Sequence, residues 1–517
     1  MKNTVITSTK KGGRYSGRFF LTSSLKNAVL LLVLSVLFPC KSPADFSTNA
    51  LIGYLTGIPA LSDYMTGSTS GQEHPAGLAE DISPYVSFAG NNQSVYRNFT
   101  GEKKRIGHSL MTLGVNYPIV KNTAGAYLSY TGNRSTLTWP FSNNRINVGE
   151  SYNDQAAAIT GYTKVFDHLR AGITTGKHIG NRGNSLLFIA EVSTYGFKKL
   201  NGSVRYYTKP YEWNLGIDYD TVTKNLPASF RSKGLEGSMS YVISDQLNVT
   251  LSGEKSGIDT PQDFPETKDQ HAQSWKMDHR KWNVLATSSH IDGITLNGSY
   301  GEDVLSGDLG LFYNSDRYMK GSLEGLVRRI QLGGQLTNGR RFIPALRYDR
   351  VSTELLLSDG VADSWPFTPK QIEIFGDKTW SFSGTGILTS DSGTFIWNLP
   401  PRSRLMLSYV RAHVDYNLRI TTRDHLSANL FDMLFGRRRN ETDTTQYYDF
   451  ANLSYMRNFT FGRFSIELGI SQLIPLYHKE KKVPGIAPEP PSFPELKLKK
   501  PENFGGFSFE FAGKWKY

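Results

Sequence analysis

Two short stretches contain the residue types of known catalytic motifs, but neither keeps the spacing that its chemistry needs. Gly107-His108-Ser109-Leu110-Met111 begins like the turn that exposes a nucleophilic serine, yet Met111 takes the place of the second glycine. The stretch from Gly172 to Lys177 imitates a phosphate loop but is one residue short, and His178 follows where a hydroxyl would bind magnesium. We therefore expect both stretches to be strand segments.

Metal and thiol chemistry also lack a pattern. The ten histidines show no HExxH spacing, and the one cysteine, Cys40, lies near the N-terminus, so a mature chain cut after Ala44 would have none. We expect no metal, no cofactor and no enzymatic activity. An outer-membrane hydrolase whose site is assembled from separate strands stays open as a less favoured alternative.

The elements that would position any site are strands. Apolar and polar residues alternate with a period of two in several segments, and no long stretch has the 3.6-residue period of a helix. The chain also has 27 Tyr, 29 Phe and 8 Trp, as the aromatic girdles of a membrane barrel require. This pattern predicts an all-β, antiparallel, up-and-down transmembrane β-barrel. The clearest alternating segments are 111–119, 213–219, 247–251, 294–300 and 464–470.

The last fifteen residues alternate most regularly of all. One face of this segment is aromatic or glycine and the other is polar, and the chain ends on Tyr517. Such a strand resembles the C-terminal sorting signal of bacterial outer-membrane barrels. The resemblance implies two partners, the barrel-assembly machinery and outer-membrane lipid. The signal residues would be Phe507, Phe509, Phe511, Trp515 and Tyr517.

The N-terminus has the pattern of a secretory signal peptide, which we place at residues 1–44. It carries seven basic residues and no acid, and an apolar run from Ala28 to Phe38 is too short to span a bilayer. Lipidation of Cys40 is a less favoured alternative, because Phe38 and Pro39 stand where small residues are needed. The formal charge of +12, less these seven, leaves +5, which is too mild to indicate nucleic acid.

Residues 45–83 lie between this leader and the barrel, which we place at 84–517. Their end reads His74-Pro75-Ala76-Gly77-Leu78, which resembles the N-P-A-G-L start of the long-chain fatty acid transporter-like family of Bacteroidetes-type bacteria. In that family the segment forms a hatch inside the barrel, so Pro75, Ala76, Gly77 and Leu78 would form a hatch motif here. The alternative is an ordinary periplasmic turn, because Pro-Ala-Gly is common turn chemistry.

We expect about 16 strands, with 14 to 20 open, joined by short turns on the periplasmic side and long loops outside. One uncertainty is whether Ser203 to Asp220 forms one bent strand or two around Pro210. The longest loops are expected at 140–150, 257–274, 419–445 and 475–502.

Function would then depend on the lumen and the loops. We expect passage of small or hydrophobic solutes across the outer membrane, with a possible small-molecule ligand. The alternative is a structural barrel that anchors a secretion or surface complex. Charged residues opposite apolar columns are expected to line the lumen: Asp218, Asp220, Arg411, His413, Asp415 and Glu467.

Overall fold

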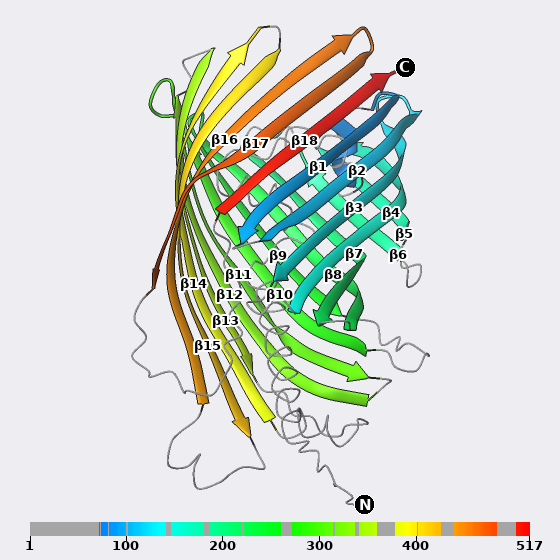
Figure 1. Ribbon diagram of the computed structural model, residues 1–517. Coiled ribbons are helices and arrows are strands. Elements are labelled where there is room, and N and C mark those ends of the chain that lie inside the picture. Colours follow the sequence, from blue (N-terminus) through cyan, green and yellow to red (C-terminus); the bar gives the residue numbers. More distant parts are fainter. Residues whose placement is uncertain are drawn as a thin grey trace, which may run out of the picture.

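The computed structural model describes residues 72, 74–80, 82–99, 102–140, 146–179, 186–195, 197, 199–219, 222–259, 271–313, 316–336, 341–358, 378–400, 402–424, 438–482 and 503–517. Within these ranges eighteen antiparallel strands form one sheet, and each strand pairs with its neighbours in the sequence. Because β1 (Tyr85–Phe99) also pairs with β18 (Asn503–Lys516), the sheet closes into a barrel (Figure 1). The described residues include no helix long and apolar enough to cross a membrane.

The other strands follow in chain order around the ring. They are β2 (Glu102–Val120), β3 (Ala124–Pro140), β4 (Ile146–Phe166), β5 (Leu169–His178), β6 (Leu186–Thr194), β7 (Leu200–Tyr219), β8 (Val222–Ser244), β9 (Leu247–Asp259), β10 (His271–Ser288), β11 (Ile294–Tyr313), β12 (Asp316–Leu336), β13 (Phe342–Ser358), β14 (Lys378–Leu399), β15 (Ser403–Asp424), β16 (Arg438–Phe461) and β17 (Phe464–Lys482).

The expectation of about 16 strands was too low. Pro210 does not divide its segment, since β7 runs through it and pairs with β8 along its length. The additional strands come from polar segments such as β10, in which the apolar column is short. The strands β5 and β6 are short and end before the loop end. From there on β4 pairs directly with β7, so the wall stays continuous.

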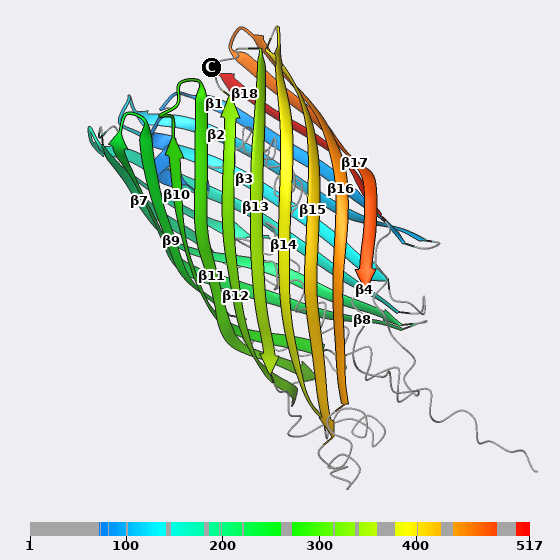
Figure 2. The ribbon, with the colours of Figure 1, turned by 90° about the vertical axis from the view of Figure 1, so that its left-hand side faces the viewer.

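One end of the barrel carries the tight turns, the start of β1 and the end of β18. We call it the turn end. Positive φ angles at Asn122 (57°), Gly293 (73°) and Gly462 (58°) produce the sharp reversals there. Tyr517 N–H donates to Pro84 O at 3.4 Å and fastens the C-terminus to the start of β1. The opposite end, from which the longer connections leave, is the loop end (Figures 1 and 2).

Strands extend further toward the loop end than the sequence indicates. The expected loops at 140–150, 257–274, 419–445 and 475–502 all overlap strand residues, for example β16 from Arg438 and β17 as far as Lys482. These strand ends are polar on both faces, as in β16, which begins Arg-Arg-Asn-Glu-Thr-Asp. A pattern search for one apolar column therefore assigns them to loops.

The register separates an outer face from an inner face. Directly paired residues share a face, so Leu113, Tyr130 and Ala157 of β2, β3 and β4 lie on one face. The other face of β3 carries Ser129 and Thr131, which hydrogen-bond Gln72, a residue enclosed by the barrel together with the short 3₁₀ helix η2 (Pro75–Glu80). Leu113 and its partners are therefore on the outside.

The outer face has an apolar belt between two aromatic rows. The row nearer the loop end, which we call the upper row, lies six residues from the turn-end start of its strands, at Tyr206, Trp282, Tyr300 and Tyr409. Two positions further toward the loop end, three of these strands carry a charged residue (Arg280, Glu302 and Arg411) and β7 carries Thr208. The eight residues from the turn-end start of a strand to this position rise roughly 20 Å, at about 3.3 Å per residue and a tilt of about 40°. This rise is close to the height of a lipid-facing band. The lower row includes Tyr117, Phe166, Tyr241, Phe342, Trp397, Phe461, Trp515 and Tyr517, all exposed.

Candidate functional site: the lumen wall

The inner wall between β6 and β11 carries a continuous row of charged residues. Glu191 is paired in register with Arg205, Arg205 with Glu236, and Glu236 with Glu254. Glu254 is opposite Lys281, and Lys281 is opposite Asp303. Cross-strand partners at this spacing interact directly, so charges of both signs alternate along most of the wall. We call Glu191, Arg205, Glu236, Glu254, Lys281 and Asp303 the inner charge row.

Arg205 is the centre of one part of this row. Its guanidinium forms an ion pair with Glu236 and lies 3.4 Å from His74 Nε2. Arg205 is 8% exposed and Glu191 is 6% exposed. A buried charge is tolerated only when paired and hydrogen-bonded, so these contacts hold the charges in place.

A second part of the row involves β9 to β12. Tyr207 O–H donates to the Glu254 carboxylate, next to the like-charged Glu236. Arg329 Nη2 lies 3.0 Å from Asp303 Oδ2. Gln331 of β12 donates through Nε2 to Asp349 Oδ1 of β13 at 2.8 Å, which extends the polar network along the wall.

The wall formed by β14 to β18 differs in character, since its inner positions are mostly hydroxyls or small apolar groups. Thr394 Oγ1 donates to Ser408 Oγ at 3.1 Å, while an apolar cluster is centred on Phe450. The lumen is thus lined by the inner charge row on one side and by mostly neutral groups on the other, where Glu467 and Glu510 are charged exceptions. The buried residues of this second wall include Ser390, Ser392, Thr394, Met406, Ser408, Val410, Ala412, Tyr448, Phe450, Asn452, Ser454, Met456, Ser471, Leu473, Ser508 and Glu510.

The 3₁₀ helix η2 sits against the charged wall. Ala76 N–H donates to Glu191 Oε2 at 3.1 Å, and Glu80 forms an ion pair with Arg170 of β5. Pro75 packs where Gly172 leaves space, because a Cβ added at Gly172 would lie 2.4 Å from the Pro75 carbonyl carbon. The predicted hatch residues therefore contact the inner wall. Residues 45–71 lie outside the described ranges.

A Ser-His-Asp grouping on the inner wall tests the hydrolase alternative. Ser256 Oγ lies 3.2 Å from His279 Nδ1, but His279 Nε2 is 3.9 Å from Asp303 Oδ1, too long for a hydrogen bond. Ser256 also lies within a strand, paired with Gly234 on one side and His279 on the other. Backbone N–H groups of such a ladder are used within the sheet, so they do not form an oxyanion hole. The two motif-like stretches around Ser109 and Lys177 are strand segments of β2 and β5, as predicted.

Three of the predicted lumen residues lie on the outer face, which corrects that expectation. Arg411 is paired with Asp449 in the column that continues through Leu453, and its side chain is exposed. His413 and Asp415 follow in the same column, with His413 Nε2 3.2 Å from Asp415 Oδ1. They lie on the loop-end side of the apolar belt, where the outer face of the barrel tolerates charge.

Of the other predicted lumen residues, Glu467 lies on the inner face, opposite Ala512 of β18. Asp218 belongs to β7, but its side chain, like the whole of Asp220, lies outside the described residues. The inner charge row was not predicted from the sequence. Its members are single charges on different strands, and only the strand pairing shows that they are neighbours.

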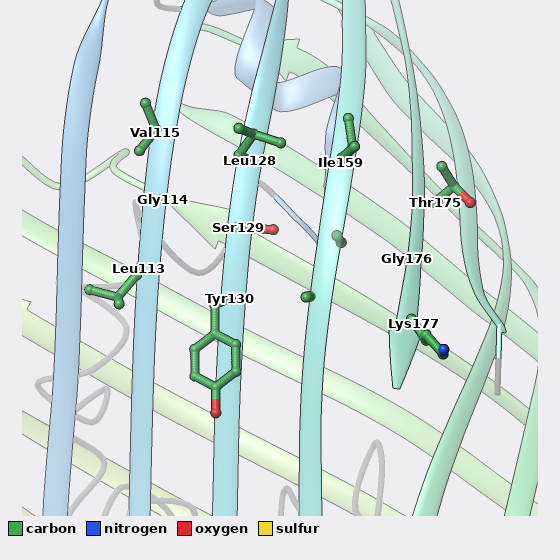
Figure 3. A pocket seen from close by; sticks show the side chains of 12 residues that line it. Leu113, Gly114, Val115, Leu128, Ser129, Tyr130, Ile159, Thr175, Gly176 and Lys177 are labelled. Carbon is green, nitrogen blue, oxygen red and sulfur yellow. The ribbon is translucent and has the colours of Figure 1, made fainter. Parts of the chain in front are cut away.

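A shallow depression of about 560 Å³ lies on the outer face of β2 to β5 (Figure 3). Leu113, Val115, Leu128 and Ile159 line it within the apolar belt. An apolar depression at this height fits a lipid chain, so we do not assign it to a solute. Among the described residues no group of three or more His, Cys, Asp or Glu side chains could hold a metal ion.

A closed antiparallel ring with an apolar belt outside and charges inside defines a transmembrane β-barrel. No family model matches the chain, and no curated protein does. Among solved structures it is similar to Pseudomonas aeruginosa OpdO, with 11% identity and a TM-score of 0.37 over 84% of this chain and 97% of that one. It is also similar to P. aeruginosa OccK2 (OpdF) in complex with glucuronate (11%, 0.37, 84% and 98%) and Acinetobacter baumannii OccAB2 (9%, 0.37, 84% and 98%). Likeness at this level supports no statement about substrate.

Proposed function

We propose that this chain is an outer-membrane channel for small polar solutes. The observation that carries the proposal is the division between the two faces: an apolar belt outside and the inner charge row inside the same closed sheet. A barrel that only anchored a partner would have no need of a charged inner wall. We further propose that the turn end faces the periplasm and the loop end faces outward.

The ring is wide enough for this role. Eighteen strands spaced about 4.8 Å apart and tilted by about 40° close into a ring of roughly 18 Å radius at the backbone. Barrels of this strand number leave room for an aqueous channel after side chains are placed. Because charges of both signs line the wall, we expect weak ion selectivity.

In this proposal residues 45–83 act as a hatch that narrows the lumen from the periplasmic side. The contacts of η2 with Glu191, Arg170 and Gly172 support it, since they fasten this segment to the wall that carries the charges. The finer resemblance to the long-chain fatty acid transporter-like family remains a prediction, as do the removed leader and the assembly signal in β18.

Conductance of the refolded mature chain in planar bilayers tests the proposal. The wild type should show discrete conductance steps, and Lys281→Gln should shift ion selectivity toward cations, because it removes a positive charge from the inner charge row. Arg280→Gln, one residue away but on the outer face, is the matched control and should leave selectivity unchanged. A wild-type barrel that folds but never conducts would refute the proposed channel.

A further inference from the structure

Three cations stand together on the outer face of β8, β9 and β10. Lys255 and Arg280 are directly opposite each other in the register. Lys233 lies diagonally from Lys255, whose direct partner on β8 is Leu235. Side chains that are directly opposite have Cβ atoms about 5 Å apart, and diagonal ones are still within reach of long side chains. We call Lys233, Lys255 and Arg280, all exposed, the outer cation cluster.

This cluster lacks the acidic partners that other outer cations have. Arg328 of β12 forms ion pairs with Glu302 and Glu354, both at 3.2 Å, and Arg411 pairs with Asp449 at 3.3 Å. Within the described part of the chain, no ion pair joins a member of the outer cation cluster to an acid.

Three carboxylates stand near the cluster on this face: Asp278, two residues from Arg280, Asp259, diagonal to Lys233, and Glu302, diagonal to Arg280. Glu302 already bonds Arg328, Tyr300 and Trp282, and within the described residues neither Asp259 nor Asp278 forms an ion pair with a member of the cluster. Like charges directly opposite each other destabilise a sheet, so the opposed pair of Lys255 and Arg280 would be stabilised by an anion from outside the protein.

The height of the cluster identifies that anion. Arg280 is two residues beyond Trp282 of the upper aromatic row, and Lys255 follows the apolar column of Val249 and Leu251. Side chains here leave the hydrocarbon and meet the polar headgroups, where the abundant anions are lipid phosphates. Arg binds phosphate oxygens through two N–H groups, and lysines add point charges on either side.

We propose that the outer cation cluster binds the phosphates of a phosphorylated glycolipid in the outer leaflet. Three cations spread over neighbouring strands match two phosphates on one molecule better than the single phosphate of an ordinary phospholipid. The proposal uses the orientation given under Proposed function, but it does not depend on conductance.

Native mass spectrometry of the purified full chain with bisphosphorylated lipid A tests this site. A cation near a membrane surface contributes a factor of about five in affinity, so K233Q/K255Q/R280Q should bind roughly a hundredfold more weakly than the wild type. Arg411→Gln removes a cation of similar height that already has an acidic partner, and it should change binding less than twofold. Gel mobility before and after boiling confirms that each variant folds.

Lipid A without phosphates and phosphatidylglycerol should each bind the wild type at least tenfold more weakly. Equal binding of phosphatidylglycerol would assign the site to ordinary phospholipid and overturn the proposal. Unchanged binding of the triple variant would also overturn it. If that variant does not fold, salt dependence of the wild type decides the question, because binding through three cations must weaken strongly between 0.05 and 0.5 M salt.

Discussion

Replacing Gly172 with valine should detach η2 from the inner wall without altering any charge. Gly172 lies on the inner face of β5, and a Cβ there would be 2.4 Å from the carbonyl carbon of Pro75 and 2.6 Å from its oxygen. Ordinary contacts of a Cβ begin near 3.4 Å. Since the clash is with backbone, η2 has to move away by about 1 Å.

This displacement has an energetic consequence that can be estimated. The hydrogen bond from Ala76 N–H to Glu191 Oε2, now 3.1 Å, would lengthen to about 4 Å and be lost. A hydrogen bond to a charged group contributes about 1.5–3 kcal/mol. At 1.4 kcal/mol for each factor of ten, the population of detached η2 should increase roughly 10- to 100-fold.

Thiol labelling measures this population. The mature chain is expected to contain no cysteine, so a single probe can be introduced as Ala79→Cys, at a position that is 0% exposed. The labelling rate by a water-soluble thiol reagent should rise 10- to 100-fold when Gly172→Val is added. Conductance should change in the same variant if η2 is part of a hatch.

Gly161→Val provides the matched control on the neighbouring strand. Gly161 is paired with Ile173 on the outer face, and a Cβ added there would meet nothing within 4 Å. Its labelling rate should equal that of the parent. An unchanged rate in the Gly172 variant, or an equal rise in both, would show that η2 does not depend on this packing.

Three further substitutions test the faces, the seam and the inner charge row, each by urea unfolding in lipid vesicles. Leu407→Arg places a charge within the apolar belt and should cost about 2–4 kcal/mol, whereas Arg411→Leu, four residues further along the same column, should change stability by less than about 0.5 kcal/mol. Gly513→Val should cost about 1–3 kcal/mol, because its Cβ would lie 2.2 Å from the Phe88 ring across the seam between β18 and β1, and Phe88→Ala in the same chain should recover part of that loss. Arg205→Gln removes the partner of Glu236 and should cost about 3 kcal/mol, more than Arg205→Lys, which keeps the charge. Equal costs of Leu407→Arg and Arg411→Leu would contradict the assignment of the faces. No recovery by Phe88→Ala would contradict the packing at the seam, and equal costs of Arg205→Gln and Arg205→Lys would contradict the role of charge in the inner charge row.

The barrel fold could be predicted because its strands alternate where they cross the belt. The segment from Met111 to Ile119 shows this in β2, and the closing strand β18 shows it in the aromatic residues from Phe507 to Trp515. Strand number was less accessible, since β10 and the ends of β16 carry polar residues on both faces. The inner charge row could not be found at all, because register is a property of pairs of strands.

The error at Arg411 has a physical cause that applies to any barrel whose strands extend beyond the membrane. On β15 the outward column begins with Leu405, Leu407 and Tyr409 and continues with Arg411. The inward column reaches Val410, which is 0% exposed within an apolar cluster. Polarity therefore reverses along one strand.

Alternation reveals the period of a strand but not which face meets lipid, because the lipid condition applies only within the belt. Distance from the turn supplies the missing information. The turn before β15 includes Arg402, and Arg411 lies nine residues beyond it, where a strand that crosses the hydrocarbon in roughly 9–11 residues reaches the far edge of the belt. Apolar columns should be assigned to lipid only within that distance of a turn, and beyond it the same column can carry the charges that meet headgroups.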